Sequence, residues 1–282
     1  MKVFQRKKDI SKYLHKLTSE GNSLGFVPTM GALHAGHLSL VKESLKDNDH
    51  SVVSIFVNPT QFDNPDDLKK YPRTYKEDLD ALKSLDPEII VYYPDAEDIY
   101  DGKIVSERFD FGGLEHEMEG KHRQGHFDGV GTIVKKLFEI IKPTRAYFGE
   151  KDFQQLQIIK KLVAQLQISI EIIPVSIHRE KDGLAMSSRN MRLTEKYRTA
   201  APFIYKTLLK TKEMWNKNSI EEIKTFVKKS FEEHPLLELE YFEIADEKNL
   251  KPTIEKINGN KYRGFIVVYA GDIRLIDNIA YY

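Results

Sequence analysis

The sequence predicts an α/β protein, with a Rossmann-like parallel sheet covered by helices on both faces and a smaller C-terminal α+β domain. Over the first 175 residues, short apolar runs rich in β-branched residues alternate with amphipathic helical stretches, a pattern typical of a buried parallel sheet. After residue 176 the order changes to helices followed by strands. We therefore expect two domains, 1–175 and 176–282.

The elements of the first domain can be assigned in chain order. Strands are expected where continuous apolar runs end at turn residues, at 24–30, 50–58, 87–94, 145–150 and 168–175. Helices are expected between them, around 38–45 and at 74–85, 129–141 and 152–166. In the third of these helices Ile133, Leu137 and Ile140 recur on one face, as helical periodicity requires.

The second domain begins with a loop at 178–190. Two Lys-rich helical stretches follow, near 195–216 and 219–233, and strand-like segments at 237–245 and 263–271 come last. This succession favours helices packed against an antiparallel sheet.

Composition is typical of a globular protein and excludes several classes. The 282 residues are 40% hydrophobic and 30% charged, and they contain no cysteine, so disulfides, cysteine nucleophiles and thiolate metal sites are excluded. The 43 basic residues balance 43 acidic ones, which argues against a nucleic-acid partner held on a broad basic surface. The N-terminus lacks the apolar core of a signal peptide. Because no apolar run approaches the length of a membrane span, we expect a cytoplasmic protein with no membrane partner.

Two histidines stand out in the stretch GFVPTMGALHAGHLSLVKES, residues 25–44. A predicted strand runs through Gly31 and Gly36 into a helix, and such a junction presents backbone N–H groups and the positive end of the helix dipole to an anion. His34 and His37 are three residues apart and would share a helical face. A nucleotide site, ordinary helix residues and a metal-binding pair all remain open from these residues alone.

Four further segments combine polar side chains with predicted strand ends or loops. SIFVNPTQF (54–62) places Asn58 and Gln61 just past a strand, where parallel sheets bind ligands, although turn chemistry also explains this pair. FGEKDFQQLQII (148–159) places Lys151 at a strand-to-helix junction. DGLAMSSRN (182–190) offers two hydroxyls and a guanidinium for a triphosphate, or a serine N-cap. EGKHRQGHFDGV (119–130) is a glycine-rich loop.

PTMGALHAGH closely resembles the ATP-binding signature of the pantoate–β-alanine ligase (pantothenate synthetase) family, a branch of the HxGH nucleotidylyltransferase superfamily. The segments NPTQF, KYPRTYKEDL, GEKDFQQL and MSSRN also look like family motifs and occur in family order. RLIDN, at 274–278, matches as well, and no chemistry is assigned to it. The resemblance spans nearly the whole chain.

The resemblance implies ATP-dependent condensation of pantoate with β-alanine through a pantoyl adenylate, with release of AMP and pyrophosphate. Implied catalytic residues are His34, His37, Lys151 and Arg189. Implied ATP contacts are Met30, Gly31, Ala32, Leu33, His34, Ala35, Gly36, His37, Gly149, Glu150, Lys151, Asp152, His178, Met186, Ser187, Ser188 and Arg189. Implied substrate contacts are Asn58, Gln61, Arg123 and Gln155.

The resemblance also implies Mg²⁺ as cofactor, a homodimer, and a C-terminal domain that covers the active site. Glu77 or Asp78 falls where a carboxylate would help to hold Mg²⁺, and a solvated acidic helix start is the alternative for both. His126 is expected to be only structural.

Two other functions are weighed against this one. A nucleotidylyltransferase acting on a phosphorylated small-molecule acceptor would yield a nucleotide-containing product and would not need β-alanine; the NPTQF and GEKDFQQL segments disfavour it. A non-catalytic nucleotide-binding module would bind ATP without turnover, and the complete set of histidines, Lys151 and Arg189 argues against it.

Overall fold

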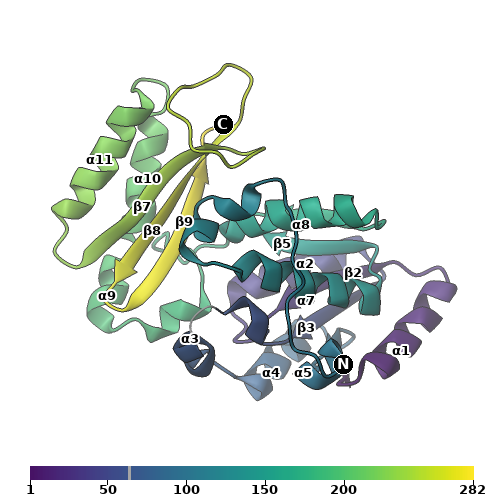
Figure 1. Ribbon diagram of the computed structural model, residues 1–282. Helices are drawn as coiled ribbons and strands as arrows, with labels where there is room; N and C mark the ends of the chain where they lie inside the picture. The colour runs from purple at the N-terminus through teal and green to yellow at the C-terminus, as the bar shows by residue number, and fades with distance from the viewer. Residues whose placement is uncertain (63–64) are drawn as a thin grey trace. The chain divides into compact units, whose positions relative to one another are not determined.

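The computed structural model describes residues 1–62 and 65–282, which form two compact units (Figure 1). The N-terminal unit comprises Met1–Glu150 and Gln154–Ser176. The C-terminal unit comprises Ile177–Tyr282 together with the short segment Lys151–Phe153. Over the described ranges, no helix is both long and apolar enough to cross a membrane.

The N-terminal unit is built on a six-stranded sheet of order β1-β4-β3-β2-β5-β6 (Figure 1). Its strands are β1 (Lys2–Phe4), β2 (Leu24–Thr29), β3 (His50–Ile55), β4 (Ile90–Tyr92), β5 (Arg145–Gly149) and β6 (Glu171–Val175). Every adjacent pair is parallel, so the predicted Rossmann-like sheet is confirmed.

Helices connect these strands and cover both faces of the sheet. They are α1 (Lys7–Ser19), α2 (Ala35–Asp47), η1 (Pro59–Gln61), α3 (Pro65–Lys70), α4 (Tyr75–Leu85), α5 (Ala96–Tyr100), η2 (Leu114–His116), α6 (Glu119–His122), α7 (His126–Ile141), η3 (Glu150–Asp152) and α8 (Phe153–Leu166). Phe26 and Val27 are consecutive in β2 and both fully buried. Phe26 packs against Phe138 of α7, whereas Val27 lies in a cluster with Val41 of α2. Since successive strand residues point to opposite faces, both faces are covered.

The order of the strands brings three predicted motifs to one edge of the sheet. β2 lies between β3 and β5, and the chain reverses its direction of travel across the sheet at this position. In open parallel sheets, ligands bind at the carboxyl ends of the strands beside such a switch. The segment at 30–37 directly follows β2, the segment at 58–61 comes shortly after the end of β3, and 149–150 includes the last residue of β5.

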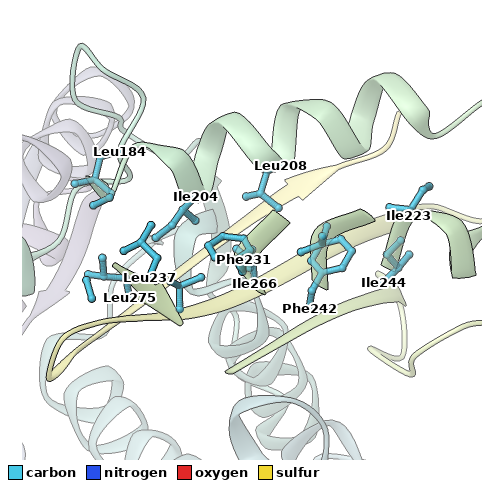
Figure 2. Packing of buried hydrophobic residues seen from close by; sticks show 14 of the residues in the cluster. Leu184, Ile204, Leu208, Ile223, Phe231, Leu237, Phe242, Ile244, Ile266 and Leu275 are labelled. Atoms are coloured by element: carbon cyan, nitrogen blue, oxygen red, sulfur yellow. The ribbon is translucent and has the colours of Figure 1, made fainter. Parts of the chain in front are cut away.

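The C-terminal unit is a three-stranded antiparallel sheet with helices packed on it. The strands are β7 (Leu237–Asp246), β8 (Tyr262–Ala270) and β9 (Ile273–Ala280), in that order. The helices are η4 (Ser188–Arg192), α9 (Glu195–Ala200), α10 (Phe203–Met214) and α11 (Ile220–Glu232). Figure 2 shows their shared core, in which Ile204 and Leu208 of α10 and Phe231 of α11 lie among strand residues such as Phe242 and Ile266.

Two details of the C-terminal unit differ from expectation. The helical stretch expected at 195–216 is interrupted, because Pro202 has no N–H for a helical hydrogen bond, and α9 and α10 are separate helices. A third strand, β9, follows the two expected ones. Arg274, Asp277 and Asn278 break its apolar pattern, so periodicity alone does not reveal it.

Candidate active site

The two motif histidines meet at the start of α2. His34 is the N-cap of this helix, and its Nδ1 accepts the N–H of Gly36 at 3.1 Å. The rings of His34 and His37 are stacked, with centroids 4.0 Å apart and planes 29° apart. Because Nδ1 of His34 is an acceptor, the neutral ring carries its hydrogen on Nε2. The predicted proximity of the two rings is confirmed, and they lie at the positive end of a thirteen-residue helix.

The loop before these histidines is held by one buried carboxylate. Asp78, in the first turn of α4, is 2% exposed. Its Oδ2 accepts the N–H of Ala32 at 3.0 Å and its Oδ1 accepts the N–H of Leu33 at 2.7 Å. Thr74 donates its hydroxyl to the same Oδ1 at 3.2 Å. Ala32 has φ 50°, a left-handed conformation that costs energy for a residue with a side chain, and these bonds offset that cost.

Glycine is required at the turn that precedes Ala32. Gly31 has φ 78°, and a Cβ on it would lie 3.0 Å from the Asp78 carboxylate and 3.1 Å from Ile55. Its N–H donates to the hydroxyl of Thr29 at 3.2 Å. Several N–H groups of this junction therefore already have acceptors within the protein. This differs from the expectation that the junction presents its N–H groups to an anion, because the nearby Thr29 and the distant Asp78 accept them.

Gln61 lies at the centre of a polar network next to β3. Its amide oxygen accepts from Asn58 Nδ2 at 3.1 Å, and its amide nitrogen contacts Met30 Sδ at 3.1 Å. Asn58 is 1% exposed and also donates to the carbonyl of Gly129 at 3.1 Å. The hydroxyl of Tyr100 donates to Asn58 Oδ1 at 2.6 Å. Both amide hydrogens of Asn58 are therefore used inside the protein, one of them to orient Gln61.

The glycine-rich segment contributes a guanidinium group and an imidazole ring that both contact Gln61. His126 Nδ1 lies 2.9 Å from the backbone carbonyl of Gln61, and Arg123 Nη2 donates to that carbonyl at 3.4 Å. Arg123 Nη1 lies 3.2 Å from His126 Nε2. An arginine can only donate, so the neutral His126 ring accepts at Nε2 and donates from Nδ1. The structure thus brings Met30, Asn58, Gln61 and Arg123 into one network.

Two adjacent glutamines at the start of α8 have different environments. Gln154 is 4% exposed, and its amide nitrogen donates to the carbonyls of Leu114 and Glu117 at 2.8 and 2.7 Å. Its oxygen accepts the N–H of Glu119 at 3.1 Å, so Gln154 holds the segment that leads to Arg123. Gln155 is half-buried and makes no side-chain hydrogen bond to any residue that the structure describes. Its amide is therefore available to a ligand.

The remaining predicted ATP contacts lie at the end of β5 in the N-terminal unit and within the C-terminal unit. Gly149 ends β5, and a Cβ on it would meet open space. Lys151 is half-buried. His178 is exposed, and its carbonyl accepts the N–H of Met186 at 3.0 Å. Ser187 caps η4 by accepting the N–H of Arg189 at 3.2 Å, which is the N-cap alternative considered for this loop. Ser188 is 6% exposed.

Comparison with known proteins decides between the functions considered for this site. The profile of pantoate-beta-alanine ligases matches residues 2–280. The pantothenate synthetase of Flavobacterium psychrophilum is 56% identical over 280 residues, and that of Christiangramia forsetii 52%, each alignment covering 99% of both chains. The chain belongs to the pantoate–β-alanine ligase family.

Solved structures of the family agree with the fold. The crystal structure of pantothenate synthetase from Thermus thermophilus matches with a TM-score of 0.92 and 34% identity, covering 100% of both chains. The ligase from Francisella tularensis, crystallised with beta-gamma ATP and beta-alanine, matches with a TM-score of 0.80 and 36% identity over 100% of this chain and 98% of its own. The expected membership of the pantoate–β-alanine ligase family is therefore confirmed.

A metal ion held by the protein fits the described residues of this family member poorly. Within residues 1–62 and 65–282, no three His, Asp or Glu side chains are grouped as metal ligands. Both carboxylate oxygens of Asp78 accept backbone N–H groups, whereas Glu77 is exposed. Carboxylates that bind Mg²⁺ supply an oxygen to the ion together with waters and phosphates, and the oxygens of Asp78 are already bonded to the backbone of Ala32 and Leu33.

Sequence reasoning missed two contributors to the site of this pantoate–β-alanine ligase, Gln154 and Tyr100, and the backbone-holding role of a third, Asp78. The contacts of Asp78 with Ala32 and Leu33 join segments 45 or more residues apart. Gln154 and Tyr100 act on Glu119 and Asn58 over similar distances in sequence. An acidic residue in the first turn of a helix is the only local signal among them, and it also suits a solvated helix start.

Proposed function

We propose that this protein condenses pantoate with β-alanine at the expense of ATP, and that AMP and pyrophosphate are the other products. The observation that carries the proposal is the stacked His34–His37 pair at the N-terminus of α2, beside the Gln61 network at the end of the neighbouring strand. The histidine pair, which suits phosphate, and the Gln61 network, which suits a polar organic substrate, thus lie side by side at a topological switch point. Family membership supplies the identity of the substrates.

The first step forms pantoyl adenylate. A carboxylate oxygen of pantoate attacks the α-phosphorus of ATP, and the bond to the pyrophosphate oxygen breaks. Negative charge accumulates on the phosphate oxygens, and His34, His37, Lys151 and Arg189 stabilise it by hydrogen bonds and charge. The stacked rings and the α2 dipole are arranged before the reaction, and such preorganised donors contribute most when the site excludes water.

The second step forms the amide. The amine of β-alanine attacks the acyl carbon of the adenylate, AMP leaves with one former carboxylate oxygen, and the amine loses a proton. Gln61 and Gln155 hold pantoate by hydrogen bonds, and Arg123 faces a substrate carboxylate. Asn58, predicted as a substrate contact, acts through Gln61, because burial and its internal bonds leave it no free amide hydrogen. Positioning accounts for the rate of both steps, since no enzyme nucleophile is required.

Other parts of the nucleotide site follow the family motifs. Adenosine and phosphate contacts come from the segments 30–37, 149–152 and 186–189 together with the backbone of His178. The open space above Gly149 supports close approach of a ligand to that backbone. Ser187 and Ser188 are the hydroxyl donors of the last segment.

Mg²⁺ would accompany ATP as its counter-ion and would help to neutralise the phosphate charge. Glu77 is exposed and remains the carboxylate available to it. The two units correspond to an N-terminal ATP- and pantoate-binding domain and a smaller C-terminal domain. We further propose that the protein acts in the cytoplasm as a homodimer.

Omission of single components tests the function. Purified protein is incubated with ATP, Mg²⁺, pantoate and β-alanine, and AMP, pyrophosphate and pantothenate are quantified with each component left out in turn. All three products are expected only from the full mixture, apart from one equivalent of pyrophosphate per site without β-alanine. Continued release of a nucleotide-containing product without β-alanine, beyond one equivalent per site, would instead support a nucleotidylyltransferase, and ADP as product would contradict the proposal.

A further inference from the structure

The RLIDN segment at 274–278 has no part in the function proposed above. It lies in β9, and two of its residues, Asp277 and Asn278, are buried polar groups with 5% and 2% exposure. Polar side chains at such depth need hydrogen-bond partners. Their partners are Arg179 and the carbonyl of Lys151.

Asp277 holds the loop that leads to Ser187 and Arg189. Its two carboxylate oxygens accept from Nη1 and Nη2 of Arg179 at 2.6 and 2.9 Å, a bidentate arrangement that fixes both groups in direction as well as distance. Arg179 Nη1 also donates to the carbonyl of Gly183 at 3.1 Å. The guanidinium lies 3.6 Å from the centre of the Tyr205 ring, which packs against it from α10.

The same loop also shares a buried apolar cluster with β9. Leu184 of the loop and Leu275 of β9 belong to one buried cluster (Figure 2). Arg179 pairs with Ala185 in an isolated β-bridge. The entry to the 186–189 segment is therefore set by β9 through Asp277 and through this core.

Asn278 holds the main chain of Lys151. Its Nδ2 donates to the carbonyl of Lys151 at 2.9 Å, and its Oδ1 accepts from Nη1 of Arg263 at 2.6 Å. Arg263 in turn lies 3.9 Å above the ring of Phe153. The carbonyl of Lys151 is thus held by a hydrogen bond from Asn278, and Phe153, two residues later, packs against Arg263.

The two residues of β9 are also bonded to each other. The N–H of Asn278 donates to Asp277 Oδ1 at 2.8 Å, the same oxygen that Arg179 Nη2 contacts. A shift of either side chain would therefore be passed to the other. Burial raises the pKa of Asp277, whereas the bonds to Arg179 and the nearby charge of Lys151 lower it, so this ion pair carries a desolvation cost that packed apolar residues would avoid.

We propose that Asp277 and Asn278 are positioning residues for adenylation, which fix Lys151 and the 186–189 segment relative to one another within the C-terminal unit. This rests on the proposed function, in which both groups bind the phosphates of ATP. The pair acts only on the phosphate-binding groups, so it controls the first chemical step. Amide formation from a preformed adenylate, which lacks the β- and γ-phosphates, depends mainly on pantoate and β-alanine contacts and is less sensitive to the pair.

Half-reactions measured separately test this. Asn278→Asp keeps the size and the acceptor for Arg263 but replaces the donor to Lys151 with an oxygen. We expect pantoate-dependent pyrophosphate release to fall by about 10- to 100-fold, the scale of a misplaced reacting group. Formation of pantothenate from supplied pantoyl adenylate and β-alanine is expected to fall by less than 10-fold, because the pyrophosphate group has already left. Asn260→Asp, at an exposed position, is the matched control and is expected to change neither.

Equal loss in both half-reactions would show a merely structural role, and no loss in either would show no role; both results overturn the proposal. If Asn278→Asp does not fold, the same comparison is made with Asn278→Ala and with Arg179→Lys, which keeps the charge but cannot form the bidentate pair. Failure of the proposed function can be distinguished from failure of the positioning role, because the wild-type protein would then release no pantoate-dependent pyrophosphate.

Discussion

The imidazole rings of His34 and His37 are stacked 4.0 Å apart at the first turn of α2. Two donors so placed can contact neighbouring oxygens of one phosphate chain, and the helix dipole adds to their effect. His34 combines helix capping with the proposed catalysis, because its Nδ1 caps α2 by accepting the N–H of Gly36. We expect substitutions here to affect adenylation more than folding.

His37→Ala is expected to lower the rate of pantoyl adenylate formation by about 10²- to 10³-fold, the effect of losing one transition-state donor. Pantoate-dependent pyrophosphate release under single-turnover conditions is the measurement. His15→Ala, on the exposed side of α1, is the control. A folded His37→Ala protein with unchanged kcat and KM would show that His37 has no catalytic role.

Asp78→Asn is expected to weaken the hydrogen bonds that hold the loop before His34. The amide retains one acceptor oxygen and presents its NH₂ group to a backbone N–H, so one loop bond is lost and stability falls by about 1–3 kcal/mol. KM for ATP should rise, and added Mg²⁺ should not restore it, since the carboxylate acts on the backbone of Ala32 and Leu33. Asp80→Asn, exposed on the same helix, serves as control. Full recovery at high Mg²⁺ would point to a metal-binding role for Asp78 instead.

Neighbouring glutamines should differ in what they control. Gln154→Ala removes three internal hydrogen bonds and is expected to lower the free energy of unfolding by about 2 kcal/mol. Gln155→Ala removes none and should instead raise KM for pantoate at unchanged thermal stability. Chemical denaturation of both variants measures the free energy of unfolding, and steady-state kinetics measures KM for pantoate. If Gln155→Ala destabilised the fold while pantoate affinity stayed the same, its assignment as a substrate contact would be wrong.

His234 is expected to make stability depend on pH. Burial lowers its pKa from 6.5, and its Nδ1 accepts the N–H groups of Leu236 and Leu237 at 3.2 and 3.1 Å, which only the unprotonated nitrogen can do. The unfolded chain then takes up the proton more readily, so stability is complete above pH 6.5 and is lost as the pH falls below it.

Thermal unfolding between pH 8 and pH 5 checks this, on the wild type and on His234→Asn. Asparagine can accept the same N–H groups without titrating, so the variant should lose less stability than the wild type over this range. Identical pH profiles for the two proteins would rule out the contribution of His234.

Local patterns were sufficient for the architecture and for the histidine pair. Continuous apolar runs alternating with helical periodicity predict the parallel sheet, and a spacing of three residues predicts that His34 and His37 share a face. Both depend on residues close in sequence. The strand order then explains why the segments after β2, β3 and β5 lie together.

Long-range polar contacts were beyond local patterns. Asp78 was predicted to hold Mg²⁺, and nothing within its own helix indicates that its carboxylate reaches the backbone of Ala32 and Leu33. Likewise the polar residues of β9 interrupt the apolar pattern by which a strand is predicted. Their partners, Arg179 and Lys151, lie about 100 or more positions away in the chain. Such residues fit the local pattern poorly because they serve a distant segment.

Transfer of oxygen from pantoate to AMP tests the central claim most directly. Pantoate labelled with ¹⁸O in both carboxylate oxygens is converted with ATP and β-alanine, and AMP and pyrophosphate are analysed by mass spectrometry. If the carboxylate attacks the α-phosphorus, each AMP gains one ¹⁸O and pyrophosphate gains none. Unlabelled AMP, or ¹⁸O in a released phosphate or pyrophosphate, would contradict the adenylate mechanism.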